Sequence, residues 1–171
     1  ADAERFRSLG ASPTRTHVTG NVKFDFELPA EVHARGLEFR RTHASGRPVW
    51  IAASTHEGEE AAVLRAHARL RERHPDALLV LVPRHPERFA GVGELVAAQG
   101  FRWVTRSSGR VAEAGTAVFL GDTMGELTTF YAAADVAFVG GSLVRIGGHN
   151  LLEPAALALP VLTGPHNENA A

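Results

Sequence analysis

The stretch from Gly140 to Pro154 holds the residues best suited to bind an anion. Its two glycine pairs remove side chains at places where a ligand would press on the backbone. A short helical pattern follows, and the first N–H groups and positive dipole end of a helix suit a phosphate group. His149, Asn150 and Glu153 add polar side chains at the same place. The pattern is typical of a nucleotide-binding crevice in an α/β protein.

Ser54 and His56 follow another apolar, strand-like run. Ser54 and Glu57 have the spacing of a helix capping box, with Ser54 as the N-cap and Glu57 at the third helical position. The Ser54 hydroxyl or nearby N–H groups could instead contact a phosphate or a sugar. The local sequence leaves both interpretations open.

Arg84 stands directly after the strand-like run from Leu78 to Pro83. A guanidinium group at a strand end is able to clamp a phosphate with two parallel hydrogen bonds. The commoner alternative for a single loop arginine is a solvated side chain that pairs with Glu87. Pro86 is expected to begin the next helix.

Residues 121–127 form a third segment of this kind. Thr123 and Glu126 again have capping-box spacing. Gly125 is expected in the first turn of a helix, where glycine lowers helix propensity. Close approach of the backbone to a flat nucleobase would explain that glycine. Met124 beside it is more often a core residue than a base contact.

Asn150 and Glu153 have capping-box spacing as well, although the Glu153 carboxylate could instead accept hydrogen bonds from two ribose hydroxyls. Pro154 falls in the first helical turn and is tolerated there. Lys23, near the end of a further predicted strand, is a candidate to neutralise phosphate charge. A solvated lysine is the alternative.

The elements that must position these residues alternate between strand-like and helical patterns. Strands are predicted over Thr16–Val22, Pro48–Ala53, Leu78–Pro83, Arg102–Thr105, Ala117–Leu120, Asp135–Val139 and Pro160–Leu162. Helices are predicted over Glu57–Arg73, Pro86–Gln99, Gly125–Ala134 and Leu151–Leu159. The runs Leu78–Val82 and Val136–Val139 are apolar on both faces, as in a parallel sheet covered on both sides. We therefore predict a doubly wound, Rossmann-like α/β domain, whose ligands bind at the carboxyl ends of the strands.

The composition excludes several other classes of protein. A formal net charge of −1 over 171 residues argues against a dominant nucleic-acid surface. Cysteine is absent, so there is no disulfide framework and no thiolate metal site. A metal site would have to gather His56, His85, His149 and His166 with Asp122, and no close histidine spacing supports that, so we predict none. No run of about 18 apolar residues predicts a membrane span. The chain begins without Met and stops just after a strand and loop, which suggests a piece of a longer protein.

The strand-end segments, taken in order, resemble one known family. They are Gly20–Asp25, Ala53–Glu60, Pro83–Phe89, Leu120–Leu127 and Gly140–Pro154. Together they resemble the carboxyl-terminal half of 3-deoxy-D-manno-octulosonic acid (Kdo) transferase, the lipid A glycosyltransferase. The resemblance runs from about Ala1 to the end of the chain. The family often has proline where Leu151 stands and in the loop near Val144–Ile146, so this chain departs from it there.

The resemblance implies a GT-B fold, in which two Rossmann-like domains face a cleft. Residues 1–171 would form a single Rossmann-like donor-binding domain, the second of the two. The N-terminal acceptor domain and the family's final helices would be absent. The residues that match the family's CMP site are Pro83, Arg84, Met124, Gly125, Glu126, Asn150, Leu151, Leu152 and Glu153. Weaker matches are Lys23, Ser54 and His56, and the family implies no cofactor and no metal.

The implied reaction is transfer of Kdo from CMP-Kdo to a lipid A precursor in lipopolysaccharide biosynthesis, with inversion at the anomeric carbon. The departing CMP phosphate takes up charge, and we expect Arg84 and the helix start at Asn150 to stabilise it, with Lys23 as a further candidate. The family's catalytic base is a glutamate of the first domain, so we expect no catalytic residue here and no activity from this part alone.

The family also implies a full-length protein at the cytoplasmic face of the inner membrane, attached through the missing part, with this part soluble. Two other functions stay open. One is a UDP-sugar-using GT-B enzyme such as an epimerase, and the other is a non-catalytic docking module that retains the fold.

Overall fold

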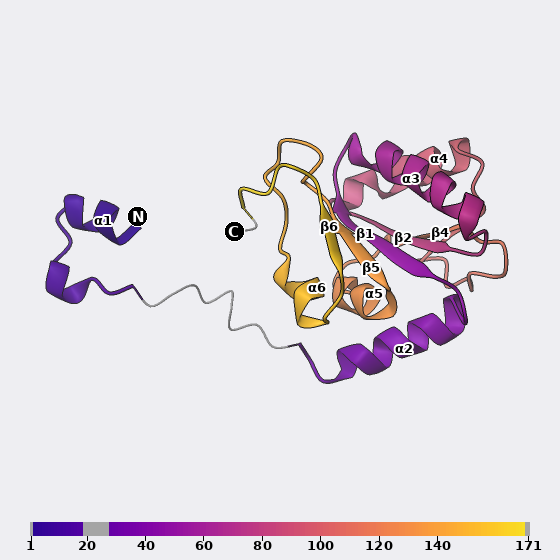
Figure 1. Cartoon of the computed structure of the whole chain (residues 1–171), viewed down its shortest axis with the longest axis horizontal. Helices are drawn as coiled ribbons and strands as arrows, with labels where there is room; N and C mark the ends of the chain where they lie inside the picture. The colour runs from indigo at the N-terminus through magenta and orange to yellow at the C-terminus, as the bar shows by residue number, and fades with distance from the viewer. Residues whose placement is uncertain (1, 19–27, 170–171) are drawn as a thin grey trace.

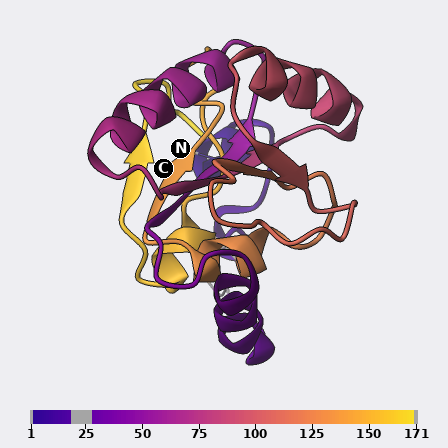
Figure 2. The same cartoon turned by 90° about the vertical axis from the view of Figure 1, so that its right-hand side faces the viewer.

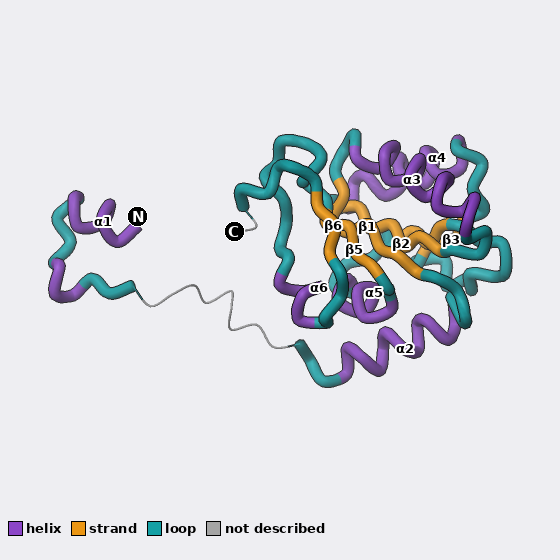
Figure 3. The backbone as a smooth tube through the Cα atoms, in the orientation of Figure 1, coloured by secondary structure: helices purple, strands orange, loops and turns teal. Residues whose placement is uncertain are grey.

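A computed structural model describes residues 2–18 and 28–169 of the chain (Figure 1). Six parallel strands form one sheet in the order β3-β4-β2-β1-β5-β6 (Figure 3). The strands are β1 (Val49–Thr55), β2 (Leu78–Pro83), β3 (Trp103–Thr105), β4 (Val118–Leu120), β5 (Val136–Val139) and β6 (Val161–Thr163). The predicted parallel α/β fold is confirmed.

Helices cover both faces of the sheet (Figures 1 and 2). On one face lie α3 (Glu59–Arg73) and α4 (Phe89–Ala98), and on the other lie α2 (Glu31–His43), α5 (Leu127–Ala133) and α6 (Leu152–Ala156). A short 3-10 helix, Pro86–Arg88, leads into α4. Near the N-terminus are α1 (Asp2–Ser8) and a second 3-10 helix, Pro13–Arg15. Within the described residues, no helix is long and apolar enough to cross a bilayer.

Two hydrophobic cores result, one on each face of the sheet. Val63, Leu64, Val92 and Val96 of α3 and α4 pack on one face, while aromatic side chains led by Phe39, Phe119 and Phe130 fill the other. All six residues of β2 are buried, because this central strand has helices on both sides. This explains why its sequence is a continuous apolar run rather than an alternating one.

The predicted strands and helices differ from the observed ones in a few places. The helix predicted from Glu57 begins at Glu59, and the one predicted over Leu151–Leu159 spans only Leu152–Ala156. The predicted strand Thr16–Val22 is wrong over its first three residues, which are irregular, and residues 19–22 lie outside the described part. Helix α2 was missed, because it buries only Val32, Gly36 and Phe39 and so shows a thin apolar stripe.

An ion pair and a neutral histidine tie helices to the sheet. Arg40 of α2 donates two hydrogen bonds to the Asp135 carboxylate at 2.7 and 3.0 Å, and the N–H of Val49 donates to it at 2.8 Å. Burial alone would raise the pKa of Asp135, but these bonds lower it. On the other face, burial lowers the pKa of His67 to about 4. His67 therefore stays neutral between its hydrogen-bond partners, the Trp50 indole and the Ala117 carbonyl.

Gly36 lets α2 and α5 touch, and replacing it should destabilise the fold. A Cβ atom at Gly36 would lie 2.5 Å from the Ala132 Cβ and 2.7 Å from its carbonyl carbon. We expect Gly36→Ala to lower the free energy of unfolding by about 1–3 kcal/mol, because backbone cannot move aside cheaply. Urea denaturation measures this change.

Gly91→Ala is the matched control, since Gly91 is also helical but a Cβ atom added there would meet no neighbouring atom within 4 Å. It should stabilise the protein by up to about 1 kcal/mol through helix propensity. Equal effects of the two substitutions would contradict the proposed contact between α2 and α5.

Candidate functional site

The carboxyl ends of adjacent strands bring the predicted site segments to one edge of the sheet. Strands β4, β2, β1 and β5 are neighbours, and Thr55 of β1 lies in register with Pro83 of β2. The contacts continue past the strands: the Arg84 N–H donates to the Thr55 carbonyl at 3.0 Å, and the Gly140 N–H donates to the Ala53 carbonyl at 2.8 Å. The loops expected to converge are therefore adjacent.

The buried carboxylate of Glu59 joins two of these loops. Its oxygens accept hydrogen bonds from the backbone N–H groups of Gly141 (2.8 Å), Ser142 (3.0 Å) and Leu143 (2.9 Å). A fourth bond comes from the His56 N–H at 2.9 Å. Glu59 has no solvent exposure. Four N–H donors to one buried carboxylate explain how the charge is tolerated there.

This contact adds a feature that the prediction for the glycine-rich stretch did not contain. The prediction placed the free N–H groups at the helix start near Asn150, and the structure forms an anion-binding concavity directly after Gly140 as well. However, the anion that occupies it is the protein's own Glu59 carboxylate. Sequence analysis gave Glu59 no role as a contact of this stretch. It missed this contact because the partners are more than 80 residues apart.

The glycines are likewise explained by the chain itself rather than by a ligand. A Cβ on Gly140 would lie 2.6 Å from the Ser54 carbonyl oxygen and 2.8 Å from a Glu59 carboxylate oxygen. A Cβ on Gly141 would lie 3.0 Å from the His149 ring. Gly147 and Gly148 have positive φ angles, of 98° and 78°. Gly140 thus lets the stretch pack against the end of β1, while Gly147 and Gly148 lie against residues 166–169.

The capping box predicted for Ser54 and Glu57 is wrong. Ser54 lies within β1, with a φ of 53°, at an irregularity in the pairing of β1 with β2. The residue before α3 is Gly58, whose φ of 91° suits a glycine, and no side chain caps this helix. Because the helix starts two residues later than expected, Glu57 is exposed and Glu59 takes the inward position. The Ser54 hydroxyl stays a predicted ligand contact.

A buried ion pair lies next to Glu59. Glu60 is 1% exposed, and Arg88 forms a two-point ion pair with its carboxylate, the bond to Oε2 measuring 3.1 Å. The hydrogen bond to Glu60 raises the pKa of Arg88. This pair fixes the start of α3 to the segment after β2. The N-terminus of α3 is therefore held by Arg88 through Glu60 and by the glycine-rich stretch through Glu59.

Three histidines meet at the same edge. His56 Nε2 lies 2.7 Å from His149 Nε2, with the two ring planes inclined by only 12° and their centroids 4.9 Å apart. The ring of His85 stands edge-on to His56 at 5.3 Å. Burial lowers the pKa of both His56 and His149. In the sequence His56 was a weaker candidate for the nucleotide site, and His149 was named as a polar side chain of the glycine-rich stretch; both were also weighed for a metal site.

The other histidine and acidic candidates for a metal site lie elsewhere. Asp122 accepts hydrogen bonds from the N–H and hydroxyl of Ser107 at 2.8 and 2.5 Å. The Nδ1 atom of His166 lies 3.9 Å from Oε1 of Glu168. Among the residues that the structure describes, no group of three or more ligating side chains is placed to hold a metal ion.

Arg84 is exposed beside the histidines, while Pro83 is buried at the end of β2. Across the described part of the chain, no ion pair involves Arg84, so the alternative of a pair with Glu87 is not observed. Its charge still lowers the pKa of His149, after the larger effects of burial and of His56. The guanidinium of Arg84 is therefore available to a ligand.

The loop 121–127 differs in detail from its prediction. Gly125 precedes α5 and has a φ of 80°, so left-handed backbone, rather than a place in the helix, accounts for the glycine. Met124 is 64% exposed and is not a core residue. The predicted capping box is wrong too: the Thr123 hydroxyl donates to the Glu126 carboxylate at 2.5 Å, and no side chain caps α5.

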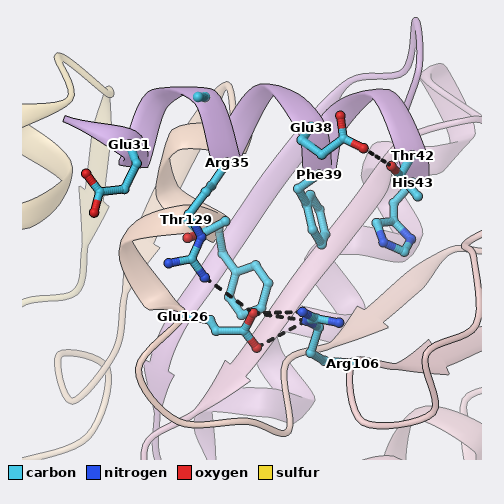
Figure 4. A pocket seen from close by; sticks show the side chains of 11 residues that line it. Glu31, Arg35, Glu38, Phe39, Thr42, His43, Arg106, Glu126 and Thr129 are labelled. Atoms are coloured by element: carbon cyan, nitrogen blue, oxygen red, sulfur yellow. Dashed lines mark hydrogen bonds and ion pairs between the residues drawn. The ribbon is translucent and has the colours of Figure 1, made fainter. Parts of the chain in front are cut away.

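Glu126 is occupied by arginines rather than free for a ligand. Arg106, after β3, donates two hydrogen bonds from Nε at 3.1 Å and one from Nη2 at 2.9 Å, and Arg35 of α2 lies 3.8 Å away (Figure 4). Burial would raise the pKa of Glu126, but its bonds with Arg106 and Thr123 lower it. Arg35, Arg106 and Glu126 border a cavity of about 420 Å³ between α2 and α5. Glu38 and His43 line the same cavity.

Asn150 and Glu153 form a local unit at the start of α6. The Asn150 side-chain oxygen accepts a hydrogen bond from the Leu152 N–H at 3.0 Å, and its amide donates to Glu153 at 3.3 Å. The N-cap position of α6 is Leu151 and no side chain caps the helix there, so Asn150 and Glu153 do not form the predicted capping box. Asn150 instead binds the N–H of the first helical residue and the Glu153 side chain. Leu151 and Leu152 are half-buried beneath them. Lys23 lies outside the described residues.

Comparison with known proteins shows the family of the chain. No family model matches the chain. A solved domain does, the C-terminal CMP-Kdo binding domain of WaaA from Acinetobacter baumannii. It shares 38% identity at a TM-score of 0.78, over 82% of this chain and 74% of that one. The chain belongs to the Kdo transferase family.

Curated relatives support the same assignment. The chain is 45% identical over 166 residues to 3-deoxy-D-manno-octulosonic acid transferase of Haemophilus influenzae, covering 97% of this chain and 39% of that protein. It is 43% identical over 173 residues to the Bordetella pertussis enzyme of the same name, covering 98% of this chain and 40% of that protein. The chain thus spans about two fifths of these relatives.

Glu59→Gln should destabilise this edge. An amide offers one acceptor oxygen and directs an NH₂ group at backbone N–H donors, so buried donors lose their partners. We expect the free energy of unfolding to fall by roughly 2–4 kcal/mol in urea denaturation.

Glu57→Gln is the control, since Glu57 is exposed in the same loop and should change stability by no more than about 0.5 kcal/mol. Glu59→Gln with wild-type stability would contradict the structural role given to this carboxylate.

Proposed function

We propose that this chain binds the CMP-Kdo donor of a Kdo transferase. The observation that supports this most directly is its likeness, at 38% identity, to a solved domain described as CMP-Kdo binding. The donor would lie at the carboxyl edge of the sheet, across the loops that follow β2, β4 and β5. Ligands of doubly wound α/β proteins bind at this edge.

Arg84 is the proposed contact of the donor phosphate. It is exposed, has no ion-pair partner among the described residues, and follows directly on the buried end of β2. Its backbone is held by the hydrogen bond to Thr55, so the side chain starts from a fixed position. A guanidinium in such a position is suited to a phosphate with two acceptor oxygens.

The loop at Met124 and Gly125 is the proposed place of the cytosine base. A Cβ atom on Gly125 would have no neighbouring atom within 4 Å, so the backbone is open to a flat ring. Glu126 acts indirectly, since its bonds to Arg106 hold this loop in place. The unit of Asn150, Leu151, Leu152 and Glu153 would receive the ribose, with the Glu153 carboxylate accepting from its hydroxyls.

The proposed reaction moves Kdo to a lipid A precursor in lipopolysaccharide biosynthesis, with inversion. Charge develops on the departing CMP phosphate, and Arg84, with Lys23 as a further candidate, would stabilise it. The acceptor domain and the catalytic base belong to the remaining part of the full-length protein, which would act at the cytoplasmic face of the inner membrane. This chain alone would bind the donor without transferring Kdo.

Calorimetry with CMP tests this proposal. We expect CMP to bind in preference to UDP, and Arg84→Ala to weaken CMP binding about 10- to 100-fold through loss of a charge-assisted phosphate contact. Arg69→Ala, which removes an exposed arginine of α3, is the control and should bind CMP as the wild type does.

Preference for UDP would contradict the CMP assignment in favour of a UDP-sugar enzyme. Absence of any nucleotide binding would favour a docking module. Detectable Kdo transfer by this chain alone would contradict the proposed place of the catalytic base.

A further inference from the structure

The contact between His56 and His149 has an unusual geometry. Their Nε2 atoms are 2.7 Å apart and their ring planes differ by 12°. Two nitrogens this close need one hydrogen between them, so one neutral ring donates and the other accepts. The Gly141 backbone lies against the His149 ring, where a Cβ would approach to 3.0 Å, and Glu59 holds the His56 backbone. Both rings are therefore fixed in place by their own loops.

The charged and titratable groups around the pair come from every element that packs on it. Glu59 and Glu60 of α3 favour a proton on His56, while His85 and Arg88, after β2, oppose it. Arg84 and His85 oppose a proton on His149, and Glu59 favours it. Burial acts against protonation of either ring. The free pair thus lies between the buried carboxylates of Glu59 and Glu60 and the basic side chains of Arg84, His85 and Arg88.

We propose that His56 and His149 act as one proton-sharing unit that takes up a proton when the phosphate group of the donor nucleotide binds beside Arg84. The inference rests on the proposed donor site and deepens it by naming how the anion is recognised. The hydrogen between the two Nε2 atoms is present already in the neutral pair, so the added proton goes to the unprotonated Nδ1 of the donor ring. The pair then becomes a single cation next to the guanidinium, with its charge spread over two rings through the shared hydrogen. It would take up one added proton and resist a second, since two adjacent imidazolium rings repel.

The Glu59 carboxylate is the reason why a bound phosphate would need a positively charged pair of side chains. The backbone N–H groups of the glycine-rich stretch, which would otherwise receive the phosphate, already donate to that carboxylate. Positive charge for the donor must then come from side chains. A phosphate anion near the pair raises its affinity for a proton, because an opposite charge within a few ångströms favours the charged form. The effect should be larger for the phosphate dianion of free CMP than for the singly charged diester of a CMP-sugar.

Calorimetry in two buffers of different ionisation enthalpy tests the proposal. The difference in observed enthalpy gives the number of protons taken up per bound ligand. At pH 6.5 we expect about 0.5–1 proton per CMP bound, because the neighbouring dianion raises the pKa of the pair. Cytidine, which lacks the phosphate, is the ligand control and should bind without proton uptake.

Variants separate the histidines from the phosphate of CMP, which itself titrates near pH 6. His56→Gln and His149→Gln should each abolish most of the uptake and weaken CMP binding more at pH 6 than at pH 8. His33→Gln, which replaces an exposed histidine of α2, should leave uptake and affinity unchanged.

The outcomes distinguish a failure of the proton-sharing pair from a failure of the donor site. CMP binding without proton uptake in the wild type, or with uptake unchanged in both histidine variants, would overturn the proton-sharing pair and leave the donor site standing. No CMP binding by the wild type would contradict the donor site, and the linkage with it. The wild-type measurement is decisive even where a variant fails to fold.

Discussion

The carboxylate of Glu59 organises the functional edge of this protein. Moving a carboxylate out of water is costly, and the structure offsets that cost with four backbone N–H donors rather than with a basic side chain. The donors come from two loops far apart in the sequence, so the carboxylate sets the distance between them. Gly140 is required because this distance leaves no room for a side chain.

The same constraint determines how a nucleotide can be recognised here. Many α/β proteins hold a phosphate with the free N–H groups of a glycine-rich turn. In this protein those groups serve the internal anion. In the proposed function, recognition of a donor phosphate would then depend on side chains at the neighbouring strand ends, chiefly Arg84 and the histidine pair. The loop of Met124 and Gly125 and the unit at Asn150 remain open on either side of them.

Much of the fold and the position of the candidate site could be predicted from the sequence. The apolar run of β2 indicated a parallel sheet, and the rule that ligands bind at strand carboxyl ends placed Arg84 and Asn150 at one edge. Helix α2 could not be predicted, because Gly36 and exposed Leu37 break its apolar stripe and its stability comes from packing on α5. That contribution depends on the tertiary structure rather than on propensity.

The capping boxes show why local spacing misleads at such a site. Ser54 with Glu57, and Thr123 with Glu126, have the right spacing, yet the strand continues past Ser54 and Arg106 binds Glu126. A charged side chain chooses its partner in three dimensions, and Glu59 finds donors that sequence spacing does not reveal. The adjacent acidic residues Glu59 and Glu60, directly after Gly58, were the available signal. Two carboxylates side by side at a helix start exceed what the helix dipole alone requires.

An amide titration of the ¹⁵N-labelled chain with CMP tests the central claim most directly. If the Glu59 carboxylate stays bound to the N–H groups of Gly141, Ser142 and Leu143, these amides should stay protected from hydrogen exchange. Their signals should also shift little when CMP binds. The large shifts should fall on Arg84, on Met124 to Glu126 and on Asn150 to Glu153. Large shifts confined to residues 141–143 would show that the phosphate displaces Glu59, and would contradict the account.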